Sequence, residues 1–533
     1  MQAPFARTLI ELVREQAQAR PQAIALVCTQ GEFTYLSLAD RAANIAGALQ
    51  ASGVKRGDRV GLLLGNCVEW LDVCLGAGAV GATVVPLSTW STRSELAFLL
   101  PDAKLSVLVA SRRFGDHDFA ASLAALQGTP GVPISDRIWL LGGGATGLSS
   151  YEHVIKTAPR FEPLPPGQAA SAGDDALVLY TSGSTSAPKA VPLRHFAVIE
   201  NAFNIGERQG LTHQDRVLLS SPLFWAFGSA NALPATFSHG ATLVLMEKFD
   251  AALALQTIAH ERCTAIYTLP AMSAAMAYHP SYDKQKLASL RTGVTIGSPE
   301  EFLFAVESLG ITELCNIYGA TETCGNCAVT WHHWPVQRRA HCQGPPLPGQ
   351  ELRFIEESTG EIAPPGTPGL VEVRGYTTLG YSGTSAAQKS KAFTVDGFYR
   401  TGDMGLLNAD GDFVFVGRVS EMIKRAGINV SPAEVEAVLR RHPSVKDAAV
   451  VGLPDTARGE RIFAYVVPVV SRDFDVDALM RHCTAESSKY KIPDHIEVCT
   501  SLPLTVTGKL QRDELKRMAI QRVLNLATPI ALA

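Results

Sequence analysis

The sequence predicts an α/β protein with a large N-terminal domain and a small C-terminal α+β domain. Its 533 residues exceed one ordinary hydrophobic core, and 46% of them are hydrophobic against 18% charged. Short apolar runs alternate with helical patterns over most of the length, which favours layered α/β subdomains with parallel strands. After about residue 420 the pattern changes to a compact α+β unit.

The N-terminal domain is expected to cover residues 1–419. Residues 1–20 mix charged and apolar side chains and predict an amphipathic helix, not a signal peptide. The longest apolar stretch, residues 71–87, contains three glycines and Asp72, so it predicts a buried helix leading into a strand and not a membrane span. The runs expected to form strands are residues 60–64, 83–86, 105–110, 176–180, 216–219 and 241–245.

Three later segments complete the expected organisation. Residues 159–173 are rich in Pro, Ala, Gly and Ser and resemble a linker between subdomains. Two apolar segments near residues 352–355 and 369–374 flank a Pro/Gly turn and predict a small β-rich subdomain. The C-terminal domain, residues 420–533, contains a predicted helix with Ser431 as N-cap and Pro432 at the first helical position.

Charge and cysteine content exclude several classes of protein. The net charge of −4 and the absence of a long basic run disfavour nucleic-acid binding. Ten scattered cysteines indicate buried thiols, not a disulfide framework. The N-terminal pattern and a C-terminus without a targeting tripeptide lead us to expect a soluble, cytoplasmic protein. Cys324 and Cys327 form a C-x-x-C pair, but the histidines and the cysteine at residues 332–342 lack regular ligand spacing, so we predict no zinc.

The most informative segment is a polar loop that follows the predicted strand at residues 176–180. Backbone N–H groups, hydroxyls and one cation at a strand tip suit phosphate oxygens. The loop is not a P-loop, because no second glycine precedes the lysine and Ala190 follows it. A polar surface loop is the structural alternative. The candidate phosphate-binding residues are Thr181, Ser182, Gly183, Ser184, Thr185 and Lys189.

Four further motifs follow in order along the chain. Tyr318 can stack on a base, and Glu322 can bind Mg²⁺. Asp403, on a tight glycine turn, can accept hydrogen bonds from both ribose hydroxyls. Arg418 is the second residue of the motif at residues 417–436, and Lys509 lies in the last motif, residues 503–510. Taken singly, each has a structural alternative such as a turn or a surface ion pair.

Together, these five motifs resemble the adenylate-forming superfamily of acyl-CoA synthetases, peptide-synthetase adenylation domains and firefly luciferase, and most closely its acyl- and aryl-CoA ligases. The resemblance covers about residues 20–515. It implies ATP, Mg²⁺ and coenzyme A as cofactors. It also implies two half-reactions, in which a carboxylate and ATP give acyl-adenylate and pyrophosphate, and a thiol then displaces AMP.

The resemblance assigns roles to residues of this chain. Lys509 would bridge the carboxylate and the α-phosphate, where a cation offsets the repulsion between like charges. Thr321 and Glu322 would bind the α-phosphate and Mg²⁺. The small C-terminal domain would be mobile and rotate between the half-reactions about a hinge at Ser420. The other cofactor-binding residues would be Gly297, Ser298, Pro299, Tyr318, Gly319, Asp403, Arg418, Lys424 and Gly427.

The sequence departs from the family pattern at several positions. Ser420 stands where the family usually has Asp or Lys, and Ser186 and Ala190 replace glycines of the phosphate loop. Trp225 takes the place of a histidine found in many relatives, and the aspartate of amino-acid-activating relatives is missing. We expect Trp225, Phe227 and Gly228 to form a hydrophobic wall of the acyl pocket; plain core packing is the alternative.

The function expected is ATP-dependent ligation of CoA to an apolar aromatic, alicyclic or medium-chain carboxylic acid. The chain ends 24 residues after Lys509, so we expect no attached carrier domain, and CoA is the simpler acceptor. An acyl-AMP ligase that loads a carrier protein in trans is the first alternative. A non-catalytic adenylate-binding protein is the second, and a luciferase-like oxygenase is disfavoured. We expect neither a nucleic-acid partner nor a membrane span.

Overall fold

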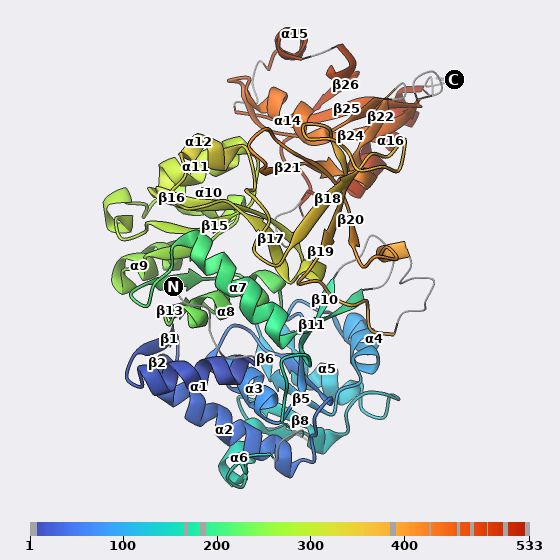
Figure 1. The fold of residues 1–533 in the computed structure, drawn as a ribbon. Helices are drawn as coiled ribbons and strands as arrows, with labels where there is room; N and C mark the ends of the chain where they lie inside the picture. The colour runs from blue at the N-terminus through green and yellow to red at the C-terminus, as the bar shows by residue number, and fades with distance from the viewer. Residues whose placement is uncertain are drawn as a thin grey trace. The chain divides into compact units, whose positions relative to one another are not determined.

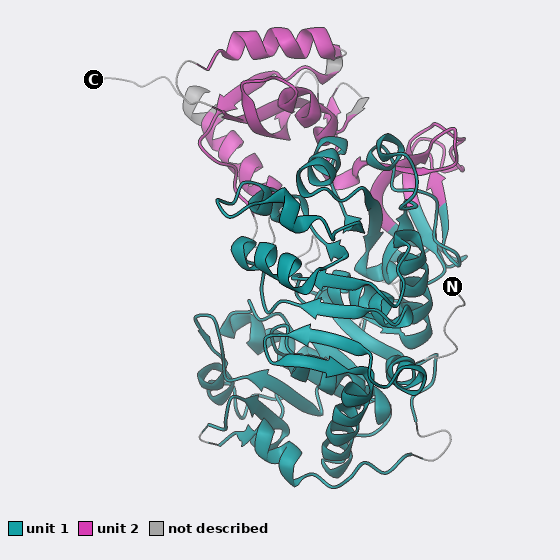
Figure 2. Ribbon diagram, turned by 90° about the vertical axis from the view of Figure 1, so that its left-hand side faces the viewer, with its two compact units in different colours: residues 1–352, 372–400 teal, residues 353–371, 401–533 magenta. Residues whose placement is uncertain are grey.

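The chain forms two compact units. The computed structural model describes residues 8–145, 147–164, 169–181, 188–383, 391–425, 428–455, 459–469, 474–487, 489–504 and 510–527 (Figure 1). Unit 1 comprises residues 1–352 and 372–400, and unit 2 comprises residues 353–371 and 401–533 (Figure 2). The predicted division into an N-terminal domain, residues 1–419, and a mobile C-terminal domain, residues 420–533, stays a prediction.

Unit 1 contains two large sheets. The first has eight strands among the described residues, and its interior neighbours from β16 to β1 are parallel. In spatial order they are β17 (Gly325–Val329), β16 (Glu313–Ala320), β15 (Thr292–Thr295), β14 (Ala265–Tyr267), β12 (Arg216–Leu219), β13 (Thr242–Leu245), β1 (Ile24–Cys28) and β2 (Gly31–Thr34).

The second sheet has seven strands in the described part of the chain and is parallel from β10 to β9. In order they are β11 (Lys189–Arg194), β10 (Asp175–Thr181), β4 (Thr83–Pro86), β3 (Arg59–Leu63), β5 (Val107–Ser111), β8 (Ile138–Leu141) and β9 (Ser149–Ser150). All six runs listed for the strands of the layered subdomains, from 60–64 to 241–245, therefore contribute to one of the two sheets, which confirms the α/β fold class. The short strands β6 (Arg113–Phe114) and β7 (His117–Asp118) form a separate hairpin.

Helices cover both faces of each sheet. One core cluster holds Leu26 and Val217 of the first sheet together with Val60 and Val84 of the second, so the helices in that cluster lie between the sheets. Those helices are α1 (Leu9–Ala19), α2 (Tyr35–Ala51), α3 (Val68–Ala79), α7 (His195–Gln209) and α8 (Leu233–Ser238). The outer faces carry α4 (Arg93–Ala103) and α5 (Phe119–Ala125) on one side and α9 (Ala251–Glu261), α10 (Pro270–Ala277) and α11 (Pro299–Leu309) on the other. Two shorter helices are α6 (Tyr151–Thr157) and α12 (Val336–Ala340).

The first helices confirm two sequence predictions. The amphipathic helix α1 begins with a capping box, in which the Thr8 side chain accepts from the backbone of Glu11 and the Glu11 side chain accepts from the backbone of Thr8. All but one residue of α3 are buried, and the chain continues into the buried strand β4, as the long apolar stretch predicted. No helix among the described residues is both long enough and apolar enough to cross a membrane.

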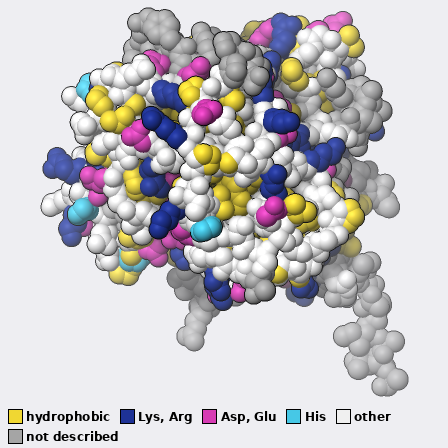
Figure 3. Space-filling view, turned by 90° about the horizontal axis from the view of Figure 1, so that it is seen from below, with side chains coloured by type: hydrophobic (Ala, Val, Ile, Leu, Met, Phe, Trp, Pro, Cys, Tyr) yellow, Lys and Arg dark blue, Asp and Glu magenta, His cyan; other side chains and the backbone are white. Residues whose placement is uncertain are grey.

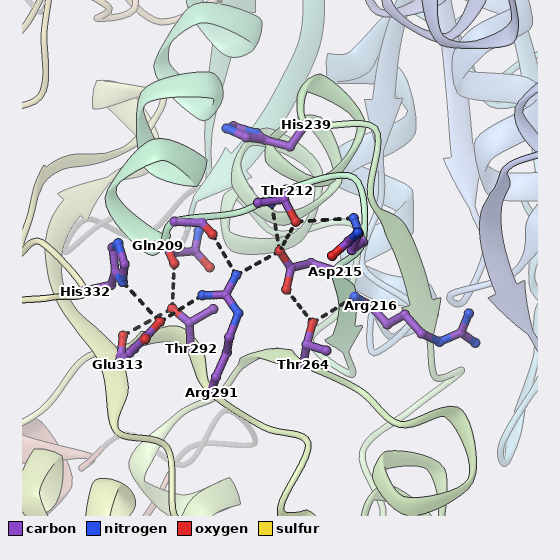
Figure 4. A network of polar contacts seen from close by, with 12 residues as sticks. Gln209, Thr212, Asp215, Arg216, His239, Thr264, Arg291, Thr292, Glu313 and His332 are labelled. Carbon is purple, nitrogen blue, oxygen red and sulfur yellow. Dashed lines mark hydrogen bonds and ion pairs between the residues drawn. The ribbon is translucent and has the colours of Figure 1, made fainter. Parts of the chain in front are cut away.

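A polar network binds the amino ends of the central strands of the first sheet (Figure 4). Arg291, immediately before β15, donates to Asp215, before β12, at 2.8 Å and to Glu313, the first residue of β16, at 2.8 Å. Thr264, before β14, donates its hydroxyl to Asp215 at 2.7 Å, and His332 Nδ1 lies 3.1 Å from Glu313. One arginine therefore fixes three strands at the same edge.

Unit 2 contains the predicted β-rich segment and the C-terminal α+β part. Most of the sheet β18 (Glu351–Ile355), β19 (Gly369–Arg374), β20 (Tyr399–Leu407) and β21 (Phe413–Arg418) lies in this unit. A second sheet follows, with β22 (Ile423–Arg425), β23 (Ile428–Val430), β24 (Val445–Asp455), β25 (Gly459–Pro468) and β26 (His495–Val498). Its helices are α14 (Pro432–Arg440), α15 (Val476–Glu486) and α16 (Arg512–Ala527).

Ser431 occupies the predicted N-cap position of α14, but its side chain does not make the expected capping hydrogen bond. Ser431 occupies the N-cap and Pro432 begins the helix, yet the Ser431 hydroxyl donates to the Val416 carbonyl at 2.8 Å and makes no cap bond. The side chain therefore connects the helix to β21.

The lower face of the molecule mixes charges of both signs. Basic, acidic and hydrophobic side chains are interspersed on the face in Figure 3, and its described residues show no large field of one sign. This distribution agrees with the small net charge of −4.

Candidate nucleotide and acyl site

The predicted phosphate loop connects two antiparallel strands of unit 1, β10 and β11. Thr181 ends β10 and pairs directly with Lys189, which begins β11. The two strands thus hold the start and the end of the loop opposite each other. Ser182, Gly183, Ser184, Thr185 and Ser186 lie outside the described residues. Ala190 is buried in β11 opposite Tyr180, where a methyl group fits the sheet.

Tyr318, Gly319, Thr321 and Glu322 lie together at the carboxyl end of β16. Tyr318 and Gly319 belong to the strand, and Thr321 and Glu322 to the one-turn helix that follows it. A Cβ on Gly319 would lie 1.9 Å from the Gly325 carbonyl oxygen, so only glycine lets β16 and β17 approach. The carboxyl ends of parallel strands are the usual place for a nucleotide in open α/β sheets.

Glu322 is a buried carboxylate whose described contacts are with uncharged groups. It is 8% exposed, and Tyr381 donates its hydroxyl to Glu322 Oε1 at 3.0 Å. Within the described ranges it forms no ion pair with a lysine, arginine or histidine. A buried charge normally has a partner, and one carboxylate together with phosphate oxygens is a common Mg²⁺ ligand set. The donor chemistry of this position therefore fits Mg²⁺ bound with ATP.

Gly297, Ser298 and Pro299 form the turn from β15 into α11. Gly297 has φ +148°, and a Cβ there would lie 2.9 Å from Glu301 Oε2, so the turn requires glycine. Ser298 is the N-cap of α11 in a capping box with Glu301, and Pro299 is its first residue. The Ser298 side chain thus caps the helix. A ligand at this segment would therefore contact its backbone more than its side chains.

The predicted acyl wall is aromatic and includes a residue that the sequence did not indicate. Trp225 is half-buried, and its ring centroid lies 5.2 Å from Trp90 and 5.9 Å from Phe224, both in edge-to-face geometry. Phe227 packs in the same way on Tyr267 at 5.1 Å and also contacts the core of unit 1. The sequence could not pair Trp90 with Trp225, because the two belong to different strand-to-helix connections.

Gly228 allows the backbone of residues 222–228 to pack closely against itself. It lies in a short π-helix, residues 227–232, and a Cβ on it would be 2.8 Å from the Pro222 carbonyl oxygen. Helices of this kind are rare and often mark functional sites. The role of Phe227 and Gly228 in an acyl pocket stays a prediction, and Phe227 also packs against the core.

Asp403, Arg418 and Lys424 belong to unit 2. Asp403 on β20 is 4% exposed and pairs in register with Arg418 on β21, whose Nε lies 3.3 Å from Asp403 Oδ1. The Arg418 side chain is 59% exposed, so it can turn toward a ligand. Lys424 on β22 donates its backbone N–H to Glu460 at 2.7 Å, and its Nζ lies 3.9 Å from Glu357.

The predicted hinge lies beside an ion-pair cluster within unit 2. Ser420 lies in a one-turn helix, and the next residue, Glu421, pairs with Arg512 at 2.9 Å. Arg512 also binds the buried Glu436 at 2.6 Å and the Val450 carbonyl at 2.9 Å. Arg512, the first residue of α16, therefore connects Glu421 beside the predicted hinge to α14 and β24.

Lys509 and Gly427 lie outside the described residues, whereas the residues on either side of the Lys509 segment are described. Leu504 and Leu510 form an antiparallel bridge, and Gln511 donates its backbone N–H to Pro503 at 3.0 Å. The described residues that flank the segment therefore lie next to each other.

The cysteines are buried thiols. Burial raises the pKa of Cys324 to about 12, and Cys327 is also fully buried. In the ranges that the structure describes, no three His, Cys, Asp or Glu side chains are grouped to hold a metal ion. The absence of zinc stays a prediction.

Sequence reasoning missed the two tyrosines beside Glu322. Burial, followed by the charge of Glu322, raises the pKa of both Tyr381 and Tyr399. Both phenols therefore stay protonated and can donate hydrogen bonds. Tyr399 is the first residue of the motif that contains Asp403, and its place in that motif was the one sequence signal that could have indicated it.

The chain matches two family patterns. The AMP-binding enzyme pattern matches residues 13–381, and the AMP-binding enzyme C-terminal domain pattern matches residues 434–509. The chain is 31% identical over 517 residues to the indoleacetate–CoA ligase of Aromatoleum aromaticum, covering 96% of this chain and 98% of the relative. It is 29% identical over 539 residues to the mitochondrial medium-chain acyl-CoA ligase ACSF2 of Bos taurus, covering 95% and 86%.

Solved structures agree over nearly the whole length. The anthranilate CoA ligase AuaEII in complex with anthranoyl-AMP matches with a TM-score of 0.87 and 27% identity, covering 98% of this chain and 100% of that one. ATP-bound MatB from Rhodopseudomonas palustris matches with a TM-score of 0.85 and 25% identity, covering 96% and 98%. With the motifs, the α/β fold and these matches in place, the chain belongs to the AMP-binding enzyme family of the adenylate-forming superfamily and is an AMP-forming acyl-CoA ligase.

Proposed function

We propose that this acyl-CoA ligase activates an apolar carboxylic acid with an aromatic, alicyclic or medium-chain tail. The observation that carries this proposal is the aromatic cluster of Trp90, Phe224 and Trp225 at the predicted acyl wall. Aromatic side chains bind a flat or aliphatic tail by area burial and edge-to-face contact. The relatives named for indoleacetate, anthranilate and medium-chain acids agree with a tail of this kind.

In this proposal the residues of unit 1 bind ATP and the acid. The loop from Thr181 to Lys189 binds the phosphates. Tyr318 lies against the adenine, and the segment of residues 297–299 also lines the adenine. Thr321 binds the α-phosphate. Glu322 holds Mg²⁺, which would neutralise phosphate charge during adenylation. A buried carboxylate at a strand end, without a described ion pair, supports this assignment.

Unit 2 supplies the remaining groups. Asp403 accepts from the ribose hydroxyls, and Arg418 contacts ribose and phosphate. Lys509 offsets the negative charge that builds up as the carboxylate attacks the α-phosphate, where a fixed cation stabilises the transition state most. Lys424 and Gly427 serve the thiol-transfer step after rotation about Ser420. CoA is the acceptor thiol.

A panel of acids tests the proposal. Pyrophosphate release is measured with ATP and Mg²⁺ for phenyl, cyclohexyl, medium-chain, dicarboxylic and amino acids, with and without CoA, and with a carrier protein as alternative acceptor. We expect an apolar monocarboxylate to give the highest kcat/KM and CoA to yield thioester and AMP. A dicarboxylate or an amino acid as the best substrate would contradict the aromatic-wall reasoning.

A further inference from the structure

A five-residue segment outside the five sequence motifs connects the two predicted phosphate-binding elements of unit 1. Thr378 donates its backbone N–H to the Glu322 carbonyl at 2.8 Å, and Ser382 donates its own to the Ala190 carbonyl at 2.9 Å. Tyr381 lies between these two bonds and contacts the side chains of Glu322 and Lys189. The segment therefore holds the start of β11 and the end of β16 at a fixed spacing.

Tyr381 contacts Glu322 and Lys189 through different parts of its side chain, and its hydroxyl also has the Tyr399 hydroxyl as a partner. Its hydroxyl donates to Glu322 Oε1 at 3.0 Å, and the ammonium of Lys189 lies 5.0 Å from the centroid of its ring. The first is a hydrogen bond to a charged group, and the second is a cation–π contact. Two different substitutions can therefore separate the contacts.

Each contact restrains a group that must be oriented to bind MgATP. A carboxylate can accept about four hydrogen bonds, so Glu322 can keep the phenol while it binds a metal. The lysine stem is flexible, and an ordered ring beneath the ammonium limits the positions that it samples. A side chain that restrains both groups before ATP arrives reduces the ordering cost of binding.

We propose that Tyr381 is a positioning residue of the nucleotide site. Its hydroxyl orients Glu322 for Mg²⁺, and its ring places Lys189 for the phosphates. This inference rests on the proposed roles of Glu322 and Lys189 in ATP binding.

Calorimetric titration of ATP at a series of Mg²⁺ concentrations tests both contacts without turnover. Tyr381→Phe removes the hydroxyl and keeps the ring. We expect it to raise the Mg²⁺ concentration for half-maximal ATP affinity by about tenfold, the usual scale for a hydrogen bond to a charged group. ATP binding without Mg²⁺ should be unchanged in this variant. Tyr381→Leu also removes the ring, and it should weaken ATP binding without Mg²⁺ as well.

The chain provides a matched control five residues away. Tyr376 is also half-buried in unit 1 and donates its hydroxyl to a glutamate, Glu200, at 3.1 Å. Tyr376→Phe should leave the Mg²⁺ dependence at the wild-type value. Tyr381→Phe would overturn the inference if it were folded and behaved like this control.

Glu322→Gln distinguishes failure of the inference from failure of the proposed function. If this variant loses the Mg²⁺ dependence while Tyr381→Phe keeps it, only the role of Tyr381 is wrong. If Glu322→Gln also retains the wild-type Mg²⁺ dependence, the metal assignment itself is wrong, and the inference falls with it. Thermal unfolding of each variant verifies that it is folded.

Discussion

Replacing Arg291 by methionine should destabilise unit 1 by about 2 kcal/mol, because it leaves Asp215 without its cation. The Asp215 side chain is 4% exposed and 2.8 Å from Arg291, which is itself 34% exposed (Figure 4). Burial alone would lower the pKa of Arg291, but its carboxylate partners outweigh this effect and raise the pKa above its ordinary value. The guanidinium thus stays charged throughout the pH range in which the protein folds.

The magnitude follows from what remains around Asp215. Breaking a fully buried ion pair costs about 3–5 kcal/mol. Asp215 keeps bonds from the Thr212 N–H at 2.7 Å, the Thr212 hydroxyl at 3.0 Å and the Thr264 hydroxyl at 2.7 Å. These donors and the exposure of Arg291 reduce the expected cost to about 2 kcal/mol. Arg291→Lys keeps the charge but cannot span Asp215 and Glu313 as a planar fork, so about half of the cost should remain.

Urea unfolding, monitored by tryptophan fluorescence, measures the loss in the free energy of unfolding from the midpoint and slope of the first unfolding transition. Arg113→Met is the control, since its pair with Asp118 is 3.5 Å long with side chains 63% and 44% exposed. A pair of this kind contributes less than about 1 kcal/mol. If Arg291→Met lowered stability by no more than Arg113→Met, the network would not be what holds the strand ends.

Three further predictions concern the site and the acid stability. Trp225→Ala should shift preference toward bulkier acids in a graded way, since one methylene is worth about 1–3 kcal/mol in such a pocket; an unchanged ranking of acids would favour core packing. Lys509→Ala should slow acyl-adenylate formation by roughly 10² or more and spare thioester formation from supplied adenylate, whereas Ser420→Pro should do the reverse. Equal damage to both half-reactions would refute rotation about Ser420. Burial lowers the pKa of His195 from 6.5 to about 4, so the unfolded chain binds this proton first and stability falls as the pH drops from 6.5 to 4. His195 Nδ1 accepts a hydrogen bond from the Leu9 N–H. An asparagine can accept the same bond but does not titrate, so His195→Asn should flatten the dependence of stability on pH in acid unfolding. An unchanged dependence would mean that another group titrates.

The sequence predicted the strands better than the contacts between them. Strands buried on both faces appear as continuous apolar runs, so β3, β4, β5, β12 and β13 were visible. Arg291 could not be assigned to Asp215 and Glu313, because no local pattern records which strands become neighbours. Ser431 was predicted as a cap from local spacing, and its hydroxyl instead bonds a strand that only the fold brings near.

The candidate site shows the same division. Motif residues such as Glu322 were found because the resemblance carries whole segments, whereas Tyr381 belongs to no motif of that comparison. Its two partners lie far from it in the sequence, and an isolated tyrosine near a glycine has no periodicity to detect. Residues that position others are therefore the ones for which the structure adds most.

In the first sheet, the residues of the stabilising ion-pair network and the candidate nucleotide residues lie at opposite ends of the same strands. Arg291 precedes β15 and Gly297 follows it, and Glu313 begins β16 while Glu322 lies just beyond its end. Because these strands are parallel, the ion-pair network and the candidate nucleotide residues lie at opposite edges of one sheet. A rigid amino edge fixes strand register, and register determines where the carboxyl-edge loops begin. Substitutions at Arg291 should consequently lower the midpoint of unfolding and leave the Mg²⁺ dependence of ATP binding intact, whereas Tyr381→Phe should do the opposite. A variant of Arg291 that changed the Mg²⁺ dependence while folded would show that the two edges are coupled through the strands.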